Sequence, residues 1–360
     1  MKKLKRQMQS LALTIILVVI LVIFHYSNFI SLSSRIANAQ DVDKLVIHVV
    51  RLKNNPIIKP EMLPGDEGKN INGPSLIRVP KWVTNPLGKY YLYFAHHLGK
   101  YIRLAYADTL EGPWKIHEPG TLRIEDTIFF SRKKGSHIAS PDVIVDDINK
   151  QIRMYFHGTC TDANDCVPYG QDSLYALSKD GISFDVSKEL LGDIYFRIFK
   201  WRKEYYAFAR LGLLYKSRDK DGLKDYFRPR RSSLFPGLGK WAKIRHLAIK
   251  VDNDFLYVFY SCIGHRPERI LVSVIKLTND WISNWQPSKP VEVLQPEEEF
   301  EGAQLPIKIS ESGSAPMPLH ELRDPYIYSE NGQDYLIYSV AGESGIAIAK
   351  LRLRWNKEGG

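Results

Sequence analysis

Short segments rich in aromatic and aliphatic residues recur along the chain between polar turns. Five four-residue segments begin at Tyr91, Arg153, Tyr206, Tyr257 and Leu336, so that successive starts are 62, 53, 51 and 79 residues apart. Aromatic and β-branched side chains pack best on pleated, half-buried surfaces. Recurrence at such intervals indicates one structural unit repeated along the chain. The pattern therefore predicts five copies of a small β-sheet.

Each aromatic segment has an expected partner strand before it and another after it, separated by turns rich in Gly, Asn, Asp or Lys. The preceding partners are expected at residues 75–80, 142–146, 194–199, 247–252 and 325–330. The following partners are expected at residues 101–107, 173–178, 213–217, 270–277 and 345–351. Antiparallel strands in groups of three or four, repeated radially, are typical of propeller blades. We therefore predict an all-β fold, a five-bladed β-propeller of antiparallel four-stranded blades.

A strand-like stretch at residues 44–52 belongs to none of these five groups. We expect it to be the outer strand of the blade that contains Tyr338, because this would close the ring from the N-terminal end and cover an exposed edge. The long interval 296–322 before that blade has no strand pattern, and loops of such length are usually functional or disordered. A β-sandwich is the alternative fold, although blade-like repetition is not expected there.

The first 39 residues have the three parts of a secretory signal peptide. Basic residues at positions 2, 3, 5 and 6 precede an apolar run over residues 11–24, and Ala37-Asn38-Ala39 follows. We place cleavage after Ala39, which leaves residues 40–360 as one propeller domain in a secreted, periplasmic or cell-surface protein. The alternative is an uncleaved membrane anchor, because residues 11–30 approach the ~20 apolar residues that span a bilayer.

Removal of this segment takes away five basic residues and lowers the formal net charge from +10 to +5. The rest of the sequence has no basic stripe interleaved with aromatic residues. A small positive surplus favours solubility or, at most, anionic ligands, and it is not the footprint of a nucleic-acid-binding protein. We expect no nucleic-acid partner, and a membrane partner only if the N-terminal segment stays uncleaved.

The chain has three cysteines. Cys160 and Cys166 bracket a polar loop, and in an exported chain this spacing favours a local disulfide. Cys262 follows an apolar run and is expected to be a small buried residue. No Cys/His spacing suggests structural zinc, and we expect no metal or other cofactor.

Several short motifs in register with the five repeats resemble those of a known superfamily. They are Asn55-Pro56-Ile57-Ile58, the Ser178-Lys179-Asp180-Gly181 turn, Glu301-Gly302, and the inner-strand openings Gly73-Pro74-Ser75, Ser140-Pro141-Asp142 and Asp324-Pro325-Tyr326. Over residues 54–352 the chain resembles the five-bladed propellers that include arabinanases, β-xylosidases, invertases and levansucrases. The resemblance implies a glycoside hydrolase with a carbohydrate substrate.

In that superfamily three carboxylates surround a central funnel and act as base or nucleophile, as modulator and as general acid. This sequence departs from the family pattern. The first blade has Gly73 before Pro where the family usually has Asp, and the second blade has Ser140 there, with a carboxylate only at Asp142. The third inner strand offers Asp193 and Arg197 in place of the usual Glu-Gly pair.

Glycoside cleavage needs one carboxylic acid to protonate the leaving oxygen and a second carboxylate to attack or to activate water. Glu321 and Asp324 stand at the entry of the last inner strand, with Arg323 between them. A neighbouring cation stabilises one carboxylate as the anion, while an apolar setting raises the pKa of another, so two acids can take different roles. The other interpretation of this cluster is a salt-bridged turn that pins the last blade.

Glu301 is the predicted general acid, because it precedes Gly302, where the backbone can approach another group closely. The acidic residues just before it, 297–299, are interpreted as a solvated charge run. Asp324 is the predicted base, with Asp142 as its competitor. We expect Glu301 or Glu321 to lie near Asp324 or Asp142, at the roughly 5–5.5 Å or 6.5–9.5 Å separations that retaining and inverting enzymes use.

Histidines recur at the expected funnel: His137 and His246 near two inner strands, and His96 and His97 after the first aromatic segment. Each is a predicted ligand of sugar hydroxyls with a structural role as the alternative, and His246 could also act as an acid because the ordinary pKa of His is near neutrality. The other predicted substrate-binding residues are Asn72, Arg197, Arg245 and Arg323. If the three arginines all face the funnel, an acidic sugar becomes a candidate substrate, because Arg suits planar carboxylates and sulfates.

Three functions stay open at this point. The leading one is a glycoside hydrolase, or a close transferase relative, that acts on an extracytoplasmic oligosaccharide or polysaccharide. The second is a non-catalytic propeller that binds glycan or protein, which the Gly and Ser at the usual Asp positions favour. The third, a membrane-tethered scaffold, requires an uncleaved N-terminal segment. Fold alone does not choose between them.

Overall fold

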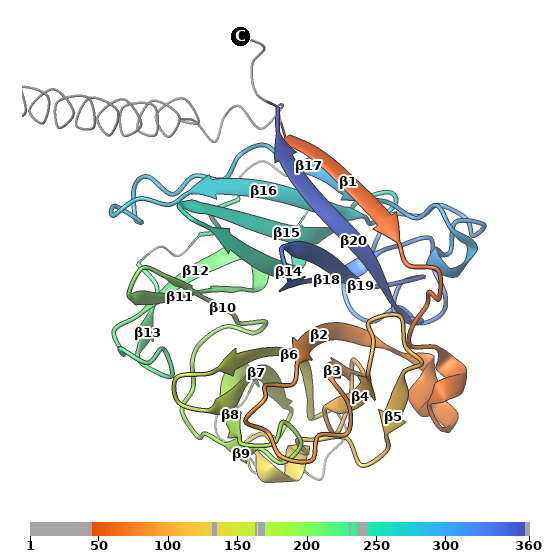
Figure 1. The fold of residues 1–360 in the computed structure, drawn as a ribbon, viewed down its shortest axis with the longest axis horizontal. Helices are drawn as coiled ribbons and strands as arrows, with labels where there is room; N and C mark the ends of the chain where they lie inside the picture. Colours follow the sequence, from red (N-terminus) through yellow and green to blue (C-terminus); the bar gives the residue numbers. More distant parts are fainter. Residues whose placement is uncertain are drawn as a thin grey trace, which may run out of the picture. The chain divides into compact units, whose positions relative to one another are not determined.

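Five antiparallel sheets of four strands each make up the part of the chain that the structure describes. The structure is a computed structural model, and it describes residues 45–131, 135–162, 164, 170–229, 232–235 and 243–356. Figure 1 shows the five sheets around a common centre. This is the predicted five-bladed β-propeller, and the prediction of an all-β fold is confirmed.

The blades follow one another in chain order, each starting at the inner strand. Blade 1 is β2 (Asn72–Arg78), β3 (Tyr90–Ala95), β4 (Arg103–Ala107) and β5 (Lys115–His117), and blade 2 is β6 (His137–Asp146), β7 (Gln151–Cys160), β8 (Gly170–Ser178) and β9 (Asp185–Val186). Blade 3 is β10 (Arg197–Trp201), β11 (Glu204–Ala209), β12 (Leu213–Ser217) and β13 (Tyr226–Phe227), and blade 4 is β14 (Lys243–Asp252), β15 (Phe255–Ile263), β16 (Ile270–Lys276) and β17 (Val291–Leu294).

Blade 5 is completed from the N-terminal side of the fold. It consists of β18 (Arg323–Glu330), β19 (Gln333–Ser339), β20 (Ile346–Trp355) and β1 (Leu45–Arg51). Strand β1 is antiparallel to β20, with Val49 opposite Leu351, and the two run side by side in Figure 1. The predicted ring closure is therefore confirmed, and the outer edge of β20 is covered.

One apolar cluster fills the space between each pair of neighbouring blades. The aromatic second strands supply both sides of these clusters. In β3, Tyr91 and Tyr93 pack towards blade 2, whereas Leu92 and Phe94 pack towards blade 5. Because successive side chains of a strand point to opposite faces, a strand sandwiched between two blades needs apolar residues at every position. This explains why these segments read as unbroken aromatic runs.

The inner strands of four blades begin earlier than the sequence predicted. We expected β6 to start at Asp142 and β14 at Leu247, but they start at His137 and Lys243. The reason is a break in register near the start of each of these strands, at 72–75, 139–142, 244–247 and 323–326. Such bulges let a strand continue past a residue that cannot pair, and they redirect side chains.

The same bulges place unusual backbone conformations at the inner ends of the blades. Positive φ angles occur at Gly73 (60°), Ser140 (54°) and Asp324 (50°), each directly before a proline. Tyr195, just before β10, has a φ of 66°. Non-glycine residues adopt such angles seldom, and they often do so at functional sites. The bulges thus aim matching side chains of several blades towards the centre.

Short 3-10 helices connect some of the strands. They are η2 (Pro60–Met62), η3 (Gly65–Lys69), η4 (Ile124–Asp126), η5 (Arg210–Gly212) and η6 (Glu299–Glu301). The long interval before blade 5 contains η6 and otherwise no regular element. Within the described residues, no helix has the length and apolar character that a membrane crossing requires.

Two predictions concern segments that the structure does not describe. The predicted signal peptide, residues 1–39, and Cys166 lie outside the described residues, so the signal peptide and the Cys160–Cys166 disulfide stay predictions. Cys262 is a free, fully buried cysteine in the apolar cluster between blades 3 and 4. Its predicted role as a small core residue is confirmed.

Candidate active site

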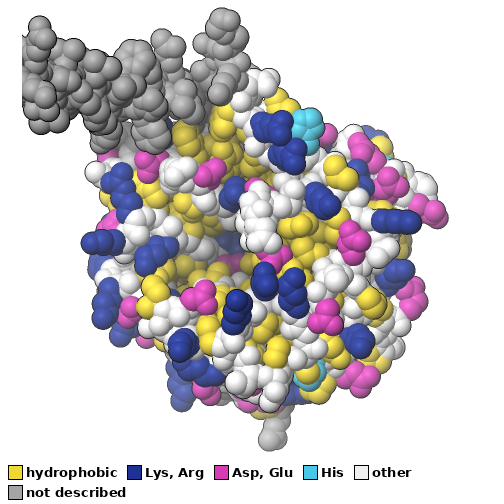
Figure 2. All heavy atoms as spheres, viewed as in Figure 1, with side chains coloured by type: hydrophobic (Ala, Val, Ile, Leu, Met, Phe, Trp, Pro, Cys, Tyr) yellow, Lys and Arg dark blue, Asp and Glu magenta, His cyan; other side chains and the backbone are white. Residues whose placement is uncertain are grey.

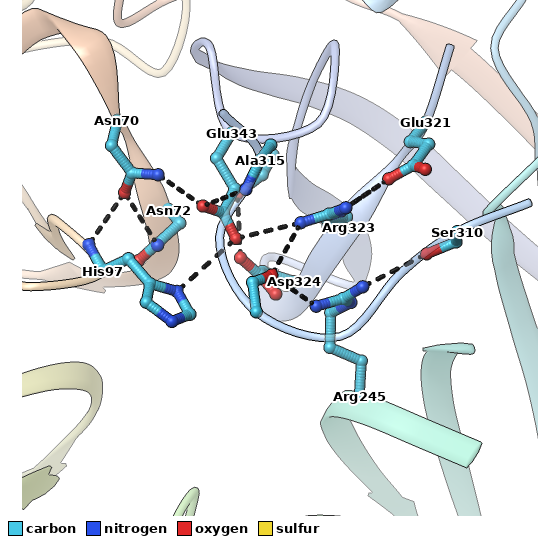
Figure 3. Close-up of polar contacts among 12 residues, drawn as sticks. Asn70, Asn72, His97, Arg245, Ser310, Ala315, Glu321, Arg323, Asp324 and Glu343 are labelled. Carbon is cyan, nitrogen blue, oxygen red and sulfur yellow. Dashed lines mark hydrogen bonds and ion pairs between the residues drawn. The ribbon is translucent and has the colours of Figure 1, made fainter. Parts of the chain in front are cut away.

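The inner ends of the blades carry a buried polar cluster centred on Arg323, at the start of β18 (Figure 3). Its Nε atom donates to Glu321 Oε2 at 2.8 Å, and its Nη1 atom donates to Glu343 Oε1 at 3.2 Å. Glu268 Oε2 lies 3.4 Å from the same Nε atom. Figure 3 shows Glu321 and Glu343 on opposite sides of the guanidinium. We call Glu268, Glu321, Arg323 and Glu343, together with Arg245, the funnel cluster.

Arg245, in β14, connects this cluster to the long loop before blade 5. Its Nε and Nη2 atoms donate to the two oxygens of Glu268 at 2.9 and 3.1 Å. Nη2 also donates to Ser310 Oγ at 3.1 Å, and Nη1 donates to the carbonyl of Gly313 at 3.0 Å. Ser310 and Gly313 belong to the interval 296–322, so the loop with no strand pattern is fastened onto the funnel.

The three arginines proposed for an acidic sugar are used by the protein itself. Arg245 and Arg323 are neutralised by the carboxylates of the funnel cluster. Arg197 donates to the backbone carbonyls of Leu247 at 3.1 Å and Ser140 at 3.2 Å, which ties together three blades. A charge already paired at short range attracts a further anion weakly. This arrangement therefore does not favour an acidic sugar.

Glu343 is held as an anion. Its carboxylate accepts hydrogen bonds from the Asn70 side chain, from the Ala315 backbone N–H at 3.2 Å and from Arg323, and the His97 ring lies 3.8 Å away. These contacts outweigh the effect of burial and lower the pKa of Glu343 to about 2. Glu343 is therefore ionised at neutral pH.

Glu321 shows the opposite tendency. It is 3% exposed, and burial raises the pKa of its carboxyl group, although Arg323 acts against this. Two carboxyl groups on one guanidinium thus have pKa values displaced in opposite directions. Divergence of this kind separates a proton donor from an ionised partner in acid–base catalysis.

Asp324 lies beside this cluster and is bound to a histidine. Its Oδ1 atom accepts a hydrogen bond from His246 Nδ1, and its Oδ2 atom accepts from the Gly73 N–H at 3.2 Å and from Ser339 Oγ at 3.3 Å. The other ring nitrogen of His246, Nε2, lies 3.4 Å from Ser140 Oγ. Strands of blades 2, 4 and 5 therefore meet in one chain of polar contacts.

A cavity of about 180 Å³, which we call the funnel cavity, opens beside these groups. Residues from all five blades line it, among them His97, Gln171, Tyr195, His246 and Glu343. A larger groove, about 650 Å³, lies towards the C-terminal ends of the inner strands β2, β6 and β18, with Ile77, Val143 and Tyr326 in its wall. We assign the site to the smaller cavity, because Arg245, His246 and Glu343 of the buried polar network line it.

Aromatic and histidine rings form a row across the funnel. His97 stacks on His137 with ring centroids 6.4 Å apart, and His137 meets His157 edge-on at 5.9 Å. Tyr195 continues the row, edge-on to His157 at 4.8 Å and to His246 at 4.0 Å. Burial lowers the pKa values of His137, His157 and His246, so these rings are neutral at neutral pH.

Two other predicted binding residues, His96 and Asn72, differ in their hydrogen-bond partners. His96 accepts a hydrogen bond from the Leu98 N–H at 3.0 Å, which is a local turn contact. Asn72 is buried and donates to Asn70 Oδ1 at 3.0 Å, but its own Oδ1 atom has no partner within the described part of the chain. An unpaired buried acceptor is costly, but Asn72 is only 1% exposed and is not among the residues that line the funnel cavity.

The structure does not bring Glu301 together with the other predicted catalytic residues. Its carboxylate is fully buried and accepts hydrogen bonds from Arg51 at 2.8 and 2.9 Å and from the Tyr338 hydroxyl at 2.8 Å. It also caps η6 through the backbone N–H groups of residues 297 and 298. Arg51 lies in the outermost strand, β1, so the observed contacts of Glu301 pin the ring closure and involve no funnel residue.

Asp142 also has a different neighbourhood. Its Oδ2 atom accepts a hydrogen bond from the Ile198 N–H at 3.2 Å, which joins blades 2 and 3. Burial raises the pKa of Asp142, and Arg197 acts in the opposite direction. The structure thus gathers Glu321, Arg323, Asp324, Arg245 and His246, whereas Asp142 sits deeper along the inner strand.

Sequence reasoning missed three residues of the site. Glu343 lies in the turn after β19, Glu268 lies in the turn before β16, and Tyr195 precedes β10. Turn residues follow no periodic pattern, so nothing marked the two glutamates. Tyr195 could have been found by alignment of the blades, because it holds the position that Ser140 and Asp324 hold in theirs. Within the described residues, no group of His, Cys, Asp and Glu is arranged to hold a metal ion.

Comparison with solved structures identifies the class of fold. An exo-1,5-α-L-arabinanase from a bovine ruminal metagenomic library superposes with a TM-score of 0.51 at 14% identity, over 79% of this chain and 93% of that one. A GH43_1 enzyme from Xanthomonas citri, complexed with xylotriose, gives 0.51 at 11% over 79% and 87%. An N-acetylgalactosamine deacetylase from F. plautii, in complex with blood group B trisaccharide, gives 0.53 at 10% over 81% and 92%.

The chain therefore has the five-bladed propeller fold of the family 43 glycoside hydrolases, which confirms the resemblance at the level of fold. No protein-family model matches the sequence. An uncharacterised protein of Acanthamoeba polyphaga mimivirus, R118, is 37% identical over 363 residues, which are 93% of this chain and 100% of that protein. The chain belongs to the same protein family as R118.

Proposed function

We propose that the protein is a glycoside hydrolase that binds an oligosaccharide or polysaccharide in the funnel cavity and cleaves a glycosidic bond there. The observation that carries this proposal is the pair Glu321 and Glu343 on opposite sides of Arg323, with pKa values displaced in opposite directions. Glu321 supplies the proton for the leaving oxygen, and Glu343 supplies the ionised carboxylate that stabilises or attacks the sugar carbon.

The neighbourhood of the cavity supports a sugar ligand. Sugars offer hydroxyl groups for polar partners and apolar C–H faces for rings, and the cavity wall has both kinds of partner. His97 and Tyr195 provide rings, and Gln171 and Arg210 provide polar groups. Solved neighbours of the same fold were obtained with xylotriose and with a blood group trisaccharide. We also propose that the protein acts outside the cytoplasm, because the first 39 residues have the three parts of a signal peptide.

Sugar release by the full chain, measured over a panel of neutral and acidic oligosaccharides, tests the proposal. Glu321→Gln and Glu343→Gln should each lower release by about 10²-fold or more, because each removes a proton-transfer or charge-stabilising group. Glu204→Gln is the matched control, since Glu204 pairs with a lysine at the surface of blade 3. Full release by both funnel variants, when folded, would rule out this carboxyl pair.

A non-catalytic glycan-binding propeller is the second candidate, and one observation favours it. The inner-end positions of the first three blades carry Gly73, Ser140 and Tyr195, and none of these is a carboxylic acid. Calorimetric titration with xylotriose and with the other panel glycans separates the two functions. Binding without release of sugar would support the binding protein, whereas release that depends on Glu343 would support the hydrolase.

A further inference from the structure

Ser140, His246 and Asp324 are arranged like the parts of a nucleophilic hydrolase. Ser140 Oγ lies 3.4 Å from His246 Nε2, and His246 Nδ1 is hydrogen-bonded to Asp324 Oδ1. A serine becomes a nucleophile when a histidine takes its proton and a carboxylate orients that histidine. Distances of this kind are often long in the absence of ligand and shorten when substrate binds.

The surroundings fix the roles of the three residues. Asp324 is anchored by the Gly73 N–H and by Ser339 Oγ, so its Oδ1 atom is held towards His246. The N–H of His246 therefore points to Asp324, which leaves the lone pair of Nε2 facing Ser140. Burial and the nearby cations Arg197 and Arg245 lower the pKa of His246. The ring is neutral and can accept a proton.

The backbone presents Ser140 in a constrained geometry. Ser140 has a positive φ of 54° within the bulge that opens β6 and is followed by Pro141. Gly73 occupies the matching position of blade 1, next to Ser140, and has no side chain of its own. A Cβ atom there would lie 3.2 Å from Ser140 Cα and 3.6 Å from Ser140 Oγ. Glycine at this position therefore lets the inner ends of blades 1 and 2 approach each other closely.

We propose that Ser140, His246 and Asp324 form a nucleophile, base and orienting group that hydrolyse an ester on a carbohydrate bound in the funnel cavity, such as an O-acetyl group. The inference rests on the proposed carbohydrate binding and not on glycosidic cleavage. His246 and Tyr195 both line the cavity, and Ser140, which is 2% exposed, adjoins the cavity wall through its contact with the His246 ring.

The reaction needs only water as a second substrate. Ser140 Oγ bonds to the acyl carbon while its proton passes to His246 Nε2, and the bond from that carbon to the sugar oxygen breaks as the sugar oxygen takes this proton. Water then adds to the acyl carbon and gives a proton to His246, and Ser140 leaves with that proton. The products are a free sugar hydroxyl and a carboxylic acid.

Tyr195 supplies a hydrogen bond to the oxygen that becomes negative in this reaction. Its ring is edge-on to His246 with centroids 4.0 Å apart, and Tyr195 lines the cavity just before β10. Burial raises the pKa of its hydroxyl, which therefore stays protonated and can donate. Removal of such a donor lowers kcat and changes KM little.

The test uses the full chain with 4-nitrophenyl acetate and acetylated xylotriose, beside a fluorophosphonate probe that labels activated serines. We expect wild-type turnover and labelling of the peptide that contains Ser140. Ser140→Ala should lose both, with turnover down by about 10³-fold, and Tyr195→Phe should lower kcat. The control is Ser273→Ala, which removes a buried hydroxyl bonded to Tyr260 in blade 4.

Two results would overturn the triad. One is turnover by folded Ser140→Ala within threefold of wild type, and the other is a wild-type protein that neither reacts with the probe nor releases acetate. Labelling of the wild-type protein does not depend on the folding of any variant. Sugar release that depends on Glu343, without ester cleavage, would support the glycoside hydrolase and rule out the triad. Ester cleavage without sugar release would support the triad and rule out the glycoside hydrolase.

Discussion

Glu321 and Glu343 bind opposite ends of the same guanidinium, that of Arg323, and their pKa values move in opposite directions. Burial dominates at Glu321, while the contacts with His97, Arg323 and Asn70 together outweigh burial at Glu343. One buried cation therefore lies between a carboxyl group whose pKa is raised and one whose pKa is lowered. This relationship is the physical basis of the proposed hydrolase, and it also makes Arg323 a critical residue for folding.

Arg323→Met should lower the free energy of unfolding by about 3–5 kcal/mol, because it leaves three buried carboxyl groups without their shared cation. Urea denaturation followed by circular dichroism measures this change. Arg218→Met is the control, because Arg218 pairs with Asp225 where both side chains are more than half exposed, and such pairs contribute less than about 1 kcal/mol. Equal effects of the two variants would contradict the arrangement described for the funnel.

Acid should weaken the fold in part through Glu343. The folded pKa of this group, about 2, is below its ordinary value of 4.5. Its stabilising contribution is therefore complete above about pH 4.5 and is lost as the pH falls towards 2. The stability of Glu343→Gln should depend less steeply on pH over this window than that of the wild type. Identical slopes in urea denaturation between pH 2 and 5 would contradict the ionised state of Glu343.

Glu301→Gln should destabilise the ring closure, because the change weakens the contacts with Arg51 and Tyr338. A hydrogen bond to a charged group is worth about 1.5–3 kcal/mol, and β1 amides should exchange with solvent faster. Glu297→Gln is the matched control, since Glu297 binds the same Arg51 at 3.0 Å but has a side chain 57% exposed. If amide exchange in β1 is unchanged in Glu301→Gln, this residue does not secure the strand.

Asn72→Ala should weaken binding of an oligosaccharide about threefold to tenfold, because one hydrogen bond contributes roughly 0.5–1.5 kcal/mol. The unpaired Oδ1 atom of Asn72 is the reason for this expectation. Calorimetric titration with the best glycan of the panel measures the change. Asn54→Ala, at an exposed turn contact, should bind as the wild type does, and equal affinities for all three proteins would remove Asn72 from the site.

The fold could be predicted from the sequence because its physical cause is periodic. A propeller buries the second strand of every blade on both faces, so the aromatic runs that start at Tyr91, Arg153, Tyr206, Tyr257 and Leu336 are the direct consequence of the architecture. The closing strand, β1, was likewise predictable. Its residues form an apolar strand outside the five repeats, and a closed ring needs such a strand to complete its last blade. The strand starts were less accurate, because bulges let the inner strands continue upstream of their x-Pro steps.

The site was predictable only in part, because turns and loops supply much of it. Glu321, Arg323 and Asp324 are adjacent in sequence and could be grouped, whereas Glu343 and Glu268 come from turns with no pattern. Glu301 was selected for the glycine after it, and Gly302 does have a positive φ of 83°. That glycine, however, ends the 3-10 helix that Glu301 caps, at the outer strand of blade 5.

The surface adds little to the assignment of function. Basic and acidic side chains are interspersed over the face shown in Figure 2. The chemistry is concentrated instead in buried groups at the inner ends of the blades.

A crystal structure of Glu343→Gln with the glycan that the panel selects tests the central claim, that the funnel cavity is the carbohydrate site. We predict a sugar ring in the cavity beside His97 and Tyr195, with the bond to be cleaved near Glu321 and residue 343. A glycan bound only in the larger groove, near Tyr326, would contradict the account.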